Sequence, residues 1–80
     1  MFYVYILKSI FNPFKNYICY TTNIDNRIAV HNSGGSSHTK KYIPWQLVTY
    51  IAFTDEKKAI DFEKYLKIGS GKAFANKRFL

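Results

Sequence analysis

Two apolar segments near the start of the chain constrain its fold more than any other feature. Residues 2–9 and 17–21 are rich in aromatic and β-branched side chains, which favour extended strands. Between them, Asn12-Pro13 is typical of a turn. Because a chain of 80 residues can build only one small core, we expect these two strands to pair as a hairpin within it.

The next segments alternate between helical and extended patterns. Thr22 or Asn23 can cap a helix over residues 24–32, and Gly34-Gly35 is a suitable stop for it. Residues 33–41 are polar, basic and rich in Gly and Ser, which predicts a mobile loop. After Pro44, residues 45–53 have the composition of a third strand.

The last third of the chain has a helical pattern. Thr54 is the predicted cap of a helix that runs to about residue 68, where Gly69 and Gly71 are expected to break it. Residues 72–80 could add a short basic helix. The predicted order is β-β-α-β-α, with that last helix left open. No linker divides the chain, so we expect one α/β domain over residues 1–80.

Composition limits the class of protein. Hydrophobic residues make up 48% of the chain and aromatic residues 19%, which excludes a disordered chain. No apolar run approaches the roughly 20 residues of a membrane span, and no signal peptide pattern stands at the start. The lone Cys19 excludes an internal disulfide framework and suits a reducing compartment. We therefore expect a cytoplasmic location and no membrane partner.

The charge of the chain is strongly positive. Twelve Lys or Arg residues against five Asp or Glu residues give a net charge of +7, with a pI near 9.6. A basic domain of this size typically binds a polyanion, most commonly nucleic acid. The alternative is that the charge serves only solubility.

The first two predicted helices carry residues that are candidates for catalysis or ligand binding. Arg27 and His31 are four residues apart and project from one helix face, where each alone is typical of an exposed polar residue. In the second predicted helix, Glu63 lies about 40° from Ala59, inside the apolar arc. A carboxylate in that arc must pair with a basic side chain, bind a cation, or lie at the edge of the arc in contact with water. Pairing with Arg27 or Lys67 and binding of a cation both remain open.

The order of these motifs resembles a known family. Tyr3-Val4-Tyr5 and Tyr17-Ile18-Cys19 resemble the paired signature of the GIY-YIG nucleases. An arginine ten residues after Tyr17, a His-Asn pair, a Lys-Tyr-x-Pro-Trp segment and a helix with a glutamate follow in order; these are Arg27, His31-Asn32, residues 41–45 and Glu63. The whole chain is similar to the small stand-alone GIY-YIG proteins, which are related to the N-terminal nuclease domain found in DNA-repair excinucleases.

The resemblance departs from the signature at two positions. Tyr3 and Cys19 stand where the two motifs have glycine. A side chain at the second position can crowd a site that glycine would leave open to the backbone. We expect Cys19 to be a buried structural thiol. Many relatives also have a late asparagine, for which Asn76 is the only candidate here, and we assign it no role.

The resemblance implies a fold and a reaction. The family fold is a small α/β sandwich, a three-stranded antiparallel sheet flanked by helices. The implied activity is metal-dependent hydrolysis of phosphodiester bonds in DNA with low sequence specificity, in repair or recombination. Glu63 would hold one Mg²⁺ or Mn²⁺ ion, a hard cation that accepts one protein carboxylate together with waters and phosphate oxygens.

The resemblance also implies roles for the remaining site residues. Arg27 would bind the scissile phosphate and stabilise its developing charge. Tyr5 or Tyr17 would orient and deprotonate the attacking water. His31 would assist with a proton or contact the phosphate. Contacts to the phosphate backbone are expected from six basic residues: Lys40, Lys41, Lys67, Lys72, Lys77 and Arg78.

Substrate and partners stay open at this level. Branched, damaged and single-stranded DNA all remain candidates, as does a partner protein that delivers the site to its substrate. A nucleic-acid-binding module of the same fold, with catalysis lost through Cys19, is the alternative function. An interaction protein whose charge only keeps it in solution is the third interpretation, and it predicts no salt-dependent binding to DNA.

Overall fold

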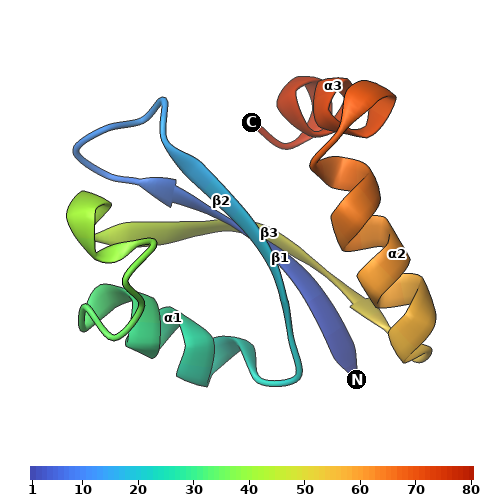
Figure 1. Ribbon diagram of the computed structural model, residues 1–80, viewed down its shortest axis with the longest axis horizontal. Coiled ribbons are helices and arrows are strands. Elements are labelled where there is room, and N and C mark those ends of the chain that lie inside the picture. Colours follow the sequence, from blue (N-terminus) through green and yellow to red (C-terminus); the bar gives the residue numbers. More distant parts are fainter.

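The computed structural model describes residues 1–80 and contains one antiparallel sheet of three strands (Figure 1). The strands are β1 (Phe2–Ser9), β2 (Asn16–Thr21) and β3 (Trp45–Phe53), in the order β2-β1-β3. The predicted hairpin and third strand are confirmed, and β2 begins one residue earlier than predicted. The hairpin strand β1 is central because β3 returns to pair with its free side.

Two helices follow the strands that the sequence places before them. Helix α1 (Ile24–Asn32) has the predicted bounds, and Asn23 caps it by accepting a hydrogen bond from the backbone N–H of Asn26 at 3.1 Å. Helix α2 (Glu56–Leu66) begins one residue later than a Thr54 cap would allow. Asp55 caps it instead, because its carboxylate accepts hydrogen bonds from two backbone N–H groups of the first turn.

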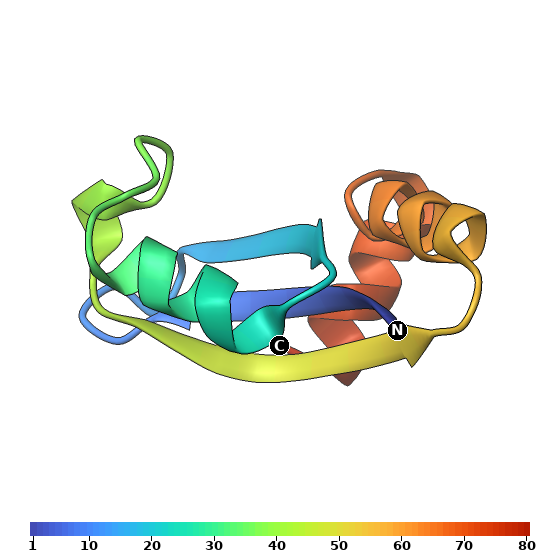
Figure 2. The ribbon, with the colours of Figure 1, turned by 90° about the horizontal axis from the view of Figure 1, so that it is seen from below.

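The sheet separates two hydrophobic clusters. On one face, Val4 and Ile6 of β1 pack with residues of α2 and of α3 (Gly69–Arg78). On the other face, Tyr5 and Leu7 pack with Trp45, beside α1 and the short 3₁₀ helix η1 (Lys40–Tyr42). This division follows from the alternation of side chains along β1. Figure 2 shows α1 and η1 gathered at one end of the sheet and α2 with α3 at the other.

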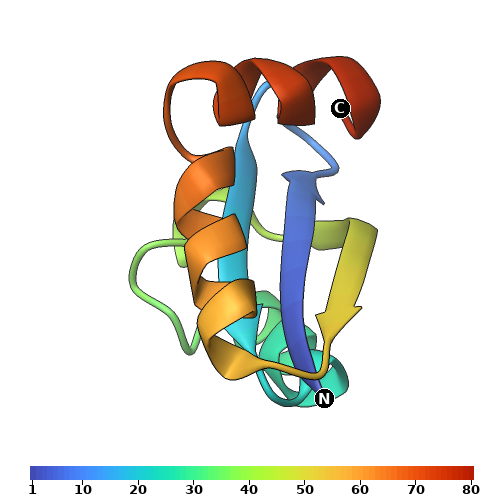
Figure 3. The same cartoon turned by 90° about the vertical axis from the view of Figure 1, so that its right-hand side faces the viewer.

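The end of the chain differs from the prediction. Helix α3 begins at Gly69, and Gly71 lies inside it rather than breaking the helical run. Gly69 has a φ of +50°, so it makes the turn between α2 and α3. Gly71 is buried where the two helices meet, and a Cβ there would overlap the carbonyl oxygen of Tyr65. Glycine at this position is a packing requirement. As Figure 3 shows, α2 then runs beside β2, with α3 crossing its end.

None of the helices is long and apolar enough to cross a membrane.

The contact at Gly71 gives a test of this packing. Helix propensity alone predicts that Gly71→Ala stabilises the protein by up to about 1 kcal/mol. The overlap with Tyr65 reverses that sign, and we expect a loss of about 1–3 kcal/mol in the free energy of unfolding. Urea denaturation measures it, with the exposed Ser70→Ala in the same turn as the control. A Gly71→Ala protein as stable as the parent would show that α2 and α3 do not pack this closely.

Candidate active site

A chain of buried hydrogen bonds joins β1 to α1. Tyr5 and His31 have no exposed surface, and the Tyr5 hydroxyl lies 2.9 Å from His31 Nε2. The other ring nitrogen, Nδ1, lies 2.7 Å from the hydroxyl of Thr39, which is also fully buried. The expectation of an exposed histidine is therefore wrong. Both ring nitrogens are engaged, and burial leaves His31 no surface that could contact a phosphate.

Residues 33–41, which were expected to be a mobile loop, contribute Thr39 to this series of buried hydrogen bonds. The carbonyl oxygen of Thr39 accepts a hydrogen bond of 2.8 Å from Trp45 Nε1. Asn32 then bridges the backbone of Trp45, accepting from its N–H at 2.6 Å and donating to its carbonyl at 3.1 Å. The segment is thereby tied to α1 and β3. Sequence reasoning missed Thr39, because nothing in a polar loop distinguishes one threonine from its neighbours.

Arg27 lies one helical turn before His31 and is partly exposed. Interaction with the Tyr5 hydroxyl raises the pKa of Arg27 above its usual value. Burial lowers the pKa of His31, and the charge of Arg27 lowers it further. His31 is therefore neutral at physiological pH, and one of its nitrogens donates while the other accepts. The single fixed positive charge among these side chains is that of Arg27.

Of the four tyrosines in the hairpin, the two candidate catalytic ones, Tyr5 and Tyr17, have different surroundings. Burial raises the pKa of Tyr5 well above its usual value, a shift that Arg27 opposes only in part. Tyr17 is partly exposed, and its ring lies edge-on to the imidazole of His31, with 5.3 Å between centroids. Burial also raises the pKa of Tyr17, but Lys67 and Arg27 both act to lower it. Of these two, Tyr17 is thus the one that combines exposure to solvent with two neighbouring cations.

Cys19 lies between these tyrosines. It is opposite Tyr5 in the strand register and on the same face as Tyr17. Cys19 is a partly exposed residue, not fully buried as expected, and its thiol donates a long hydrogen bond of 3.6 Å to the carbonyl of Tyr20. Its proximity contributes to the raised pKa of both tyrosines.

Glu63 reaches the same edge of the sheet from α2. Its side chain is 16% exposed, and Oε2 accepts a hydrogen bond of 2.9 Å from Lys67 Nζ, one turn later. Of the two pairings left open by the sequence, the structure contains the one with Lys67. No three His, Cys, Asp or Glu side chains cluster together, so the structure contains no site formed by several protein ligands. The single, partly exposed carboxylate of Glu63 fits a hard cation whose other ligands are waters and phosphate oxygens.

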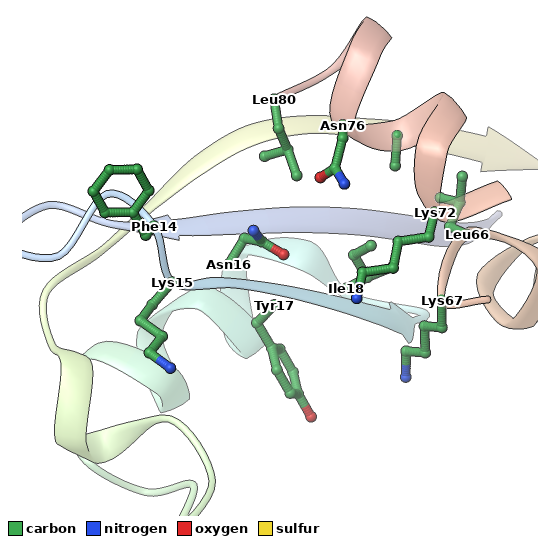
Figure 4. Close-up of a pocket in the computed structure, with 11 residues that line it drawn as sticks. Phe14, Lys15, Asn16, Tyr17, Ile18, Leu66, Lys67, Lys72, Asn76 and Leu80 are labelled. Carbon is green, nitrogen blue, oxygen red and sulfur yellow. The ribbon is translucent and has the colours of Figure 1, made fainter. Parts of the chain in front are cut away.

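The basic residues divide into separate groups. Lys67 and Lys72 line a groove of about 530 Å³ between β2 and α3, together with Lys15, which the sequence analysis did not single out (Figure 4). Lys40 and Lys41 lie on η1, beside the α1 face of the sheet. Lys77 and Arg78 are exposed at the end of α3, outside the groove, as a separate basic group.

Comparison with known proteins shows a consistent relationship. The family model described as the GIY-YIG catalytic domain matches residues 1–78. A UPF0213 protein of Streptococcus pneumoniae is 35% identical over 66 residues, which are 81% of this chain and 65% of that protein. The matched part thus spans just under two thirds of that relative. A UPF0213 protein of Staphylococcus haemolyticus is 41% identical over 66 residues, covering 81% and 78%.

A solved structure shares the fold over nearly the whole chain. The NMR structure of a UPF0213 protein from Bacillus halodurans has a TM-score of 0.57 and 31% identity. The match covers 99% of this chain and 87% of that one. The α/β fold predicted from the sequence is therefore found in a relative as well.

The burial of neutral His31 predicts how stability depends on pH. Its pKa is lowered in the folded state, so the unfolded chain binds the proton more tightly. Stability should therefore fall as the pH decreases through about 6.5, the usual pKa of histidine. Chemical denaturation between about pH 8 and pH 5 measures this slope. His31→Gln should flatten it, whereas the exposed His38→Gln should retain it. An equal slope in His31→Gln would assign the pH dependence to other groups.

Proposed function

Because the chain belongs to the GIY-YIG catalytic domain family, which is generally a family of nucleases, we propose that it is a metal-dependent endonuclease that hydrolyses phosphodiester bonds in DNA. The observation that supports this most is the position of Tyr17, which feels the charges of both Arg27 on α1 and Lys67 just after α2, where Lys67 pairs with Glu63. Low sequence specificity and a place in DNA repair or recombination are parts of the same proposal.

In this proposal Arg27 binds the scissile phosphate. Its guanidinium is partly exposed, while its interaction with buried Tyr5 limits where it can point. A planar guanidinium can donate two parallel hydrogen bonds to phosphate oxygens and stabilise the charge that develops on them. Tyr5 and His31 act through Arg27 as positioning residues, since neither has exposed surface of its own.

Tyr17 is the residue that orients the attacking water. Its hydroxyl is the accessible one of the pair, and Lys67 and Arg27 both favour its ionised form. Tyr17 can accept a proton from water only in its phenolate form, and the two cations favour that form by lowering the pKa of the hydroxyl. Buried Tyr5 lacks contact with solvent water and has its hydroxyl engaged with His31.

Glu63 would hold the metal ion. With Mg²⁺ or Mn²⁺ bound, the carboxylate would be neutralised without Lys67, whose Nζ would then be free to contact a phosphate oxygen. A divalent ion bound there would neutralise phosphate charge and lower the pKa of a water bound to it. The ion pair it displaces is partly exposed, and such pairs contribute little stability.

A nucleic-acid-binding module without catalysis is the second candidate. The side chain of Cys19 between the two tyrosines favours it, because the thiol occupies space that glycine would leave open. A binding module retains salt-dependent affinity for DNA, since lysine contacts to phosphate release counterions. It does not nick supercoiled plasmid with Mg²⁺ or Mn²⁺, so that assay separates the two candidates.

Replacement of Glu63 tests the metal assignment. Glu63→Gln keeps the size of the side chain and removes the charge that binds the ion, so we expect plasmid nicking to be lost and the fold retained. Glu56→Gln on the same helix is the control, because Glu56 is exposed and contacts Tyr20 rather than the site. A folded Glu63→Gln protein that still nicks plasmid with Mg²⁺ would remove Glu63 from the mechanism.

Replacement of Arg27 separates catalysis from binding. Arg27→Ala should slow single-turnover cleavage by roughly two to four powers of ten, as loss of a preorganised donor does elsewhere. DNA affinity should fall far less, because several lysines contribute to it. Arg27→Lys should recover only part of the rate, since an ammonium lacks the bidentate geometry. Cleavage that falls only in proportion to affinity or thermal stability would make Arg27 a structural residue.

A further inference from the structure

The groove beside Tyr17 has one basic and one apolar component. Lys15, Lys67 and Lys72 line it, and no acidic side chain does. Apolar side chains complete the lining, among them Leu66, Leu80 and Phe14. Its volume of about 530 Å³ falls within the range of ~300–1,000 Å³ that is usual for small-ligand pockets. The lining suits an anionic occupant that also has an apolar surface.

The apolar side of the groove is extended by the loop between β1 and β2. Phe14 is 91% exposed and lines the groove, as Figure 4 shows. Phe11 is 82% exposed in the same loop but does not line it. An aromatic ring so open to water, next to a cluster of lysines, presents a flat surface on which a base can stack.

The groove is continuous with the candidate active site. Tyr17 and Lys67 belong to both, and Figure 4 shows their side chains pointing the same way, past the outer edge of β2. Lys67 also contacts Glu63. A nucleic-acid strand with its scissile phosphate near Arg27 and Tyr17 can therefore continue along the groove toward Phe14.

We propose that this groove holds unpaired nucleotides of the substrate strand, next to the bond that is cut, with one base stacked on Phe14. This inference rests on the proposed nuclease function and names its substrate class. Lys67 and Lys72 contact the phosphates of the same segment. The nucleotides are unpaired because a duplex stacks its bases on each other and offers no free base face to a ring at the groove wall. The preferred substrate is thus single-stranded DNA, or a duplex with a single-stranded branch at the site.

Binding in the presence of a chelator tests this without cleavage. The probes are a short single-stranded oligonucleotide carrying one 2-aminopurine, whose fluorescence falls when it stacks, and the fully paired duplex of the same sequence. We expect Phe14→Ala to weaken single-strand binding roughly 5- to 150-fold, the range for one lost stacking contact, and to restore the fluorescence. Duplex binding should change little. Phe14→Trp should keep both the affinity and the quenching.

Phe11→Ala is the matched control, because Phe11 is similarly exposed in the same loop but lies outside the groove. The proposal is overturned if Phe14→Ala leaves single-strand affinity unchanged, if it weakens duplex binding equally, or if Phe11→Ala has the same effect. A dimeric parent that becomes monomeric in Phe14→Ala would instead assign the loop to a second copy of the chain. Phe14-dependent binding without any metal-dependent nicking would overturn the nuclease function but support the groove as a single-strand site.

Discussion

The hydrogen bond between Tyr5 and His31 is the interaction on which the site depends. It joins residues 26 positions apart whose side chains are fully buried, where an unpaired polar group costs about 1–3 kcal/mol. Thr39 satisfies the remaining imidazole nitrogen, and no buried side-chain nitrogen or oxygen in the protein lacks a partner. Because each polar side-chain atom of Tyr5, His31 and Thr39 has a hydrogen-bond partner, these bonds determine the orientation of α1 on the sheet. The position of Arg27, which lies on α1, is determined with it.

The second constraint is that β2 lies at an edge of the sheet. Tyr17 projects from the face that α1 covers, whereas α2 packs against the opposite face of the sheet. Glu63 belongs to α2, and Lys67 is the residue that caps its end. No further strand separates these groups, so side chains from both faces can approach each other past β2, and Figure 4 shows those of Tyr17 and Lys67 pointing the same way there. A small sheet with an open edge thus allows a site that a wider sheet would divide.

Local features of the sequence determined most of the elements. Aromatic and β-branched runs identified all three strands, and the bounds of β1, β3 and α1 were predicted to the residue. The spacing of short motifs indicated the family, which the comparisons then supported. The start of α2 was predicted less accurately, because Thr54 and Asp55 are both good caps and only the backbone geometry selects Asp55.

The tertiary structure decided what those motifs do together. The sequence left His31 an exposed residue and Thr39 part of a mobile loop, since periodicity reports only on the element that carries it. Their burial depends on how β1, α1 and the segment before β3 pack, which involves contacts between distant parts of the chain. The same holds for Gly71, whose pattern predicts a helix break and whose role is close helix packing. Side-chain identity was local information, but burial and pairing were properties of the assembled fold.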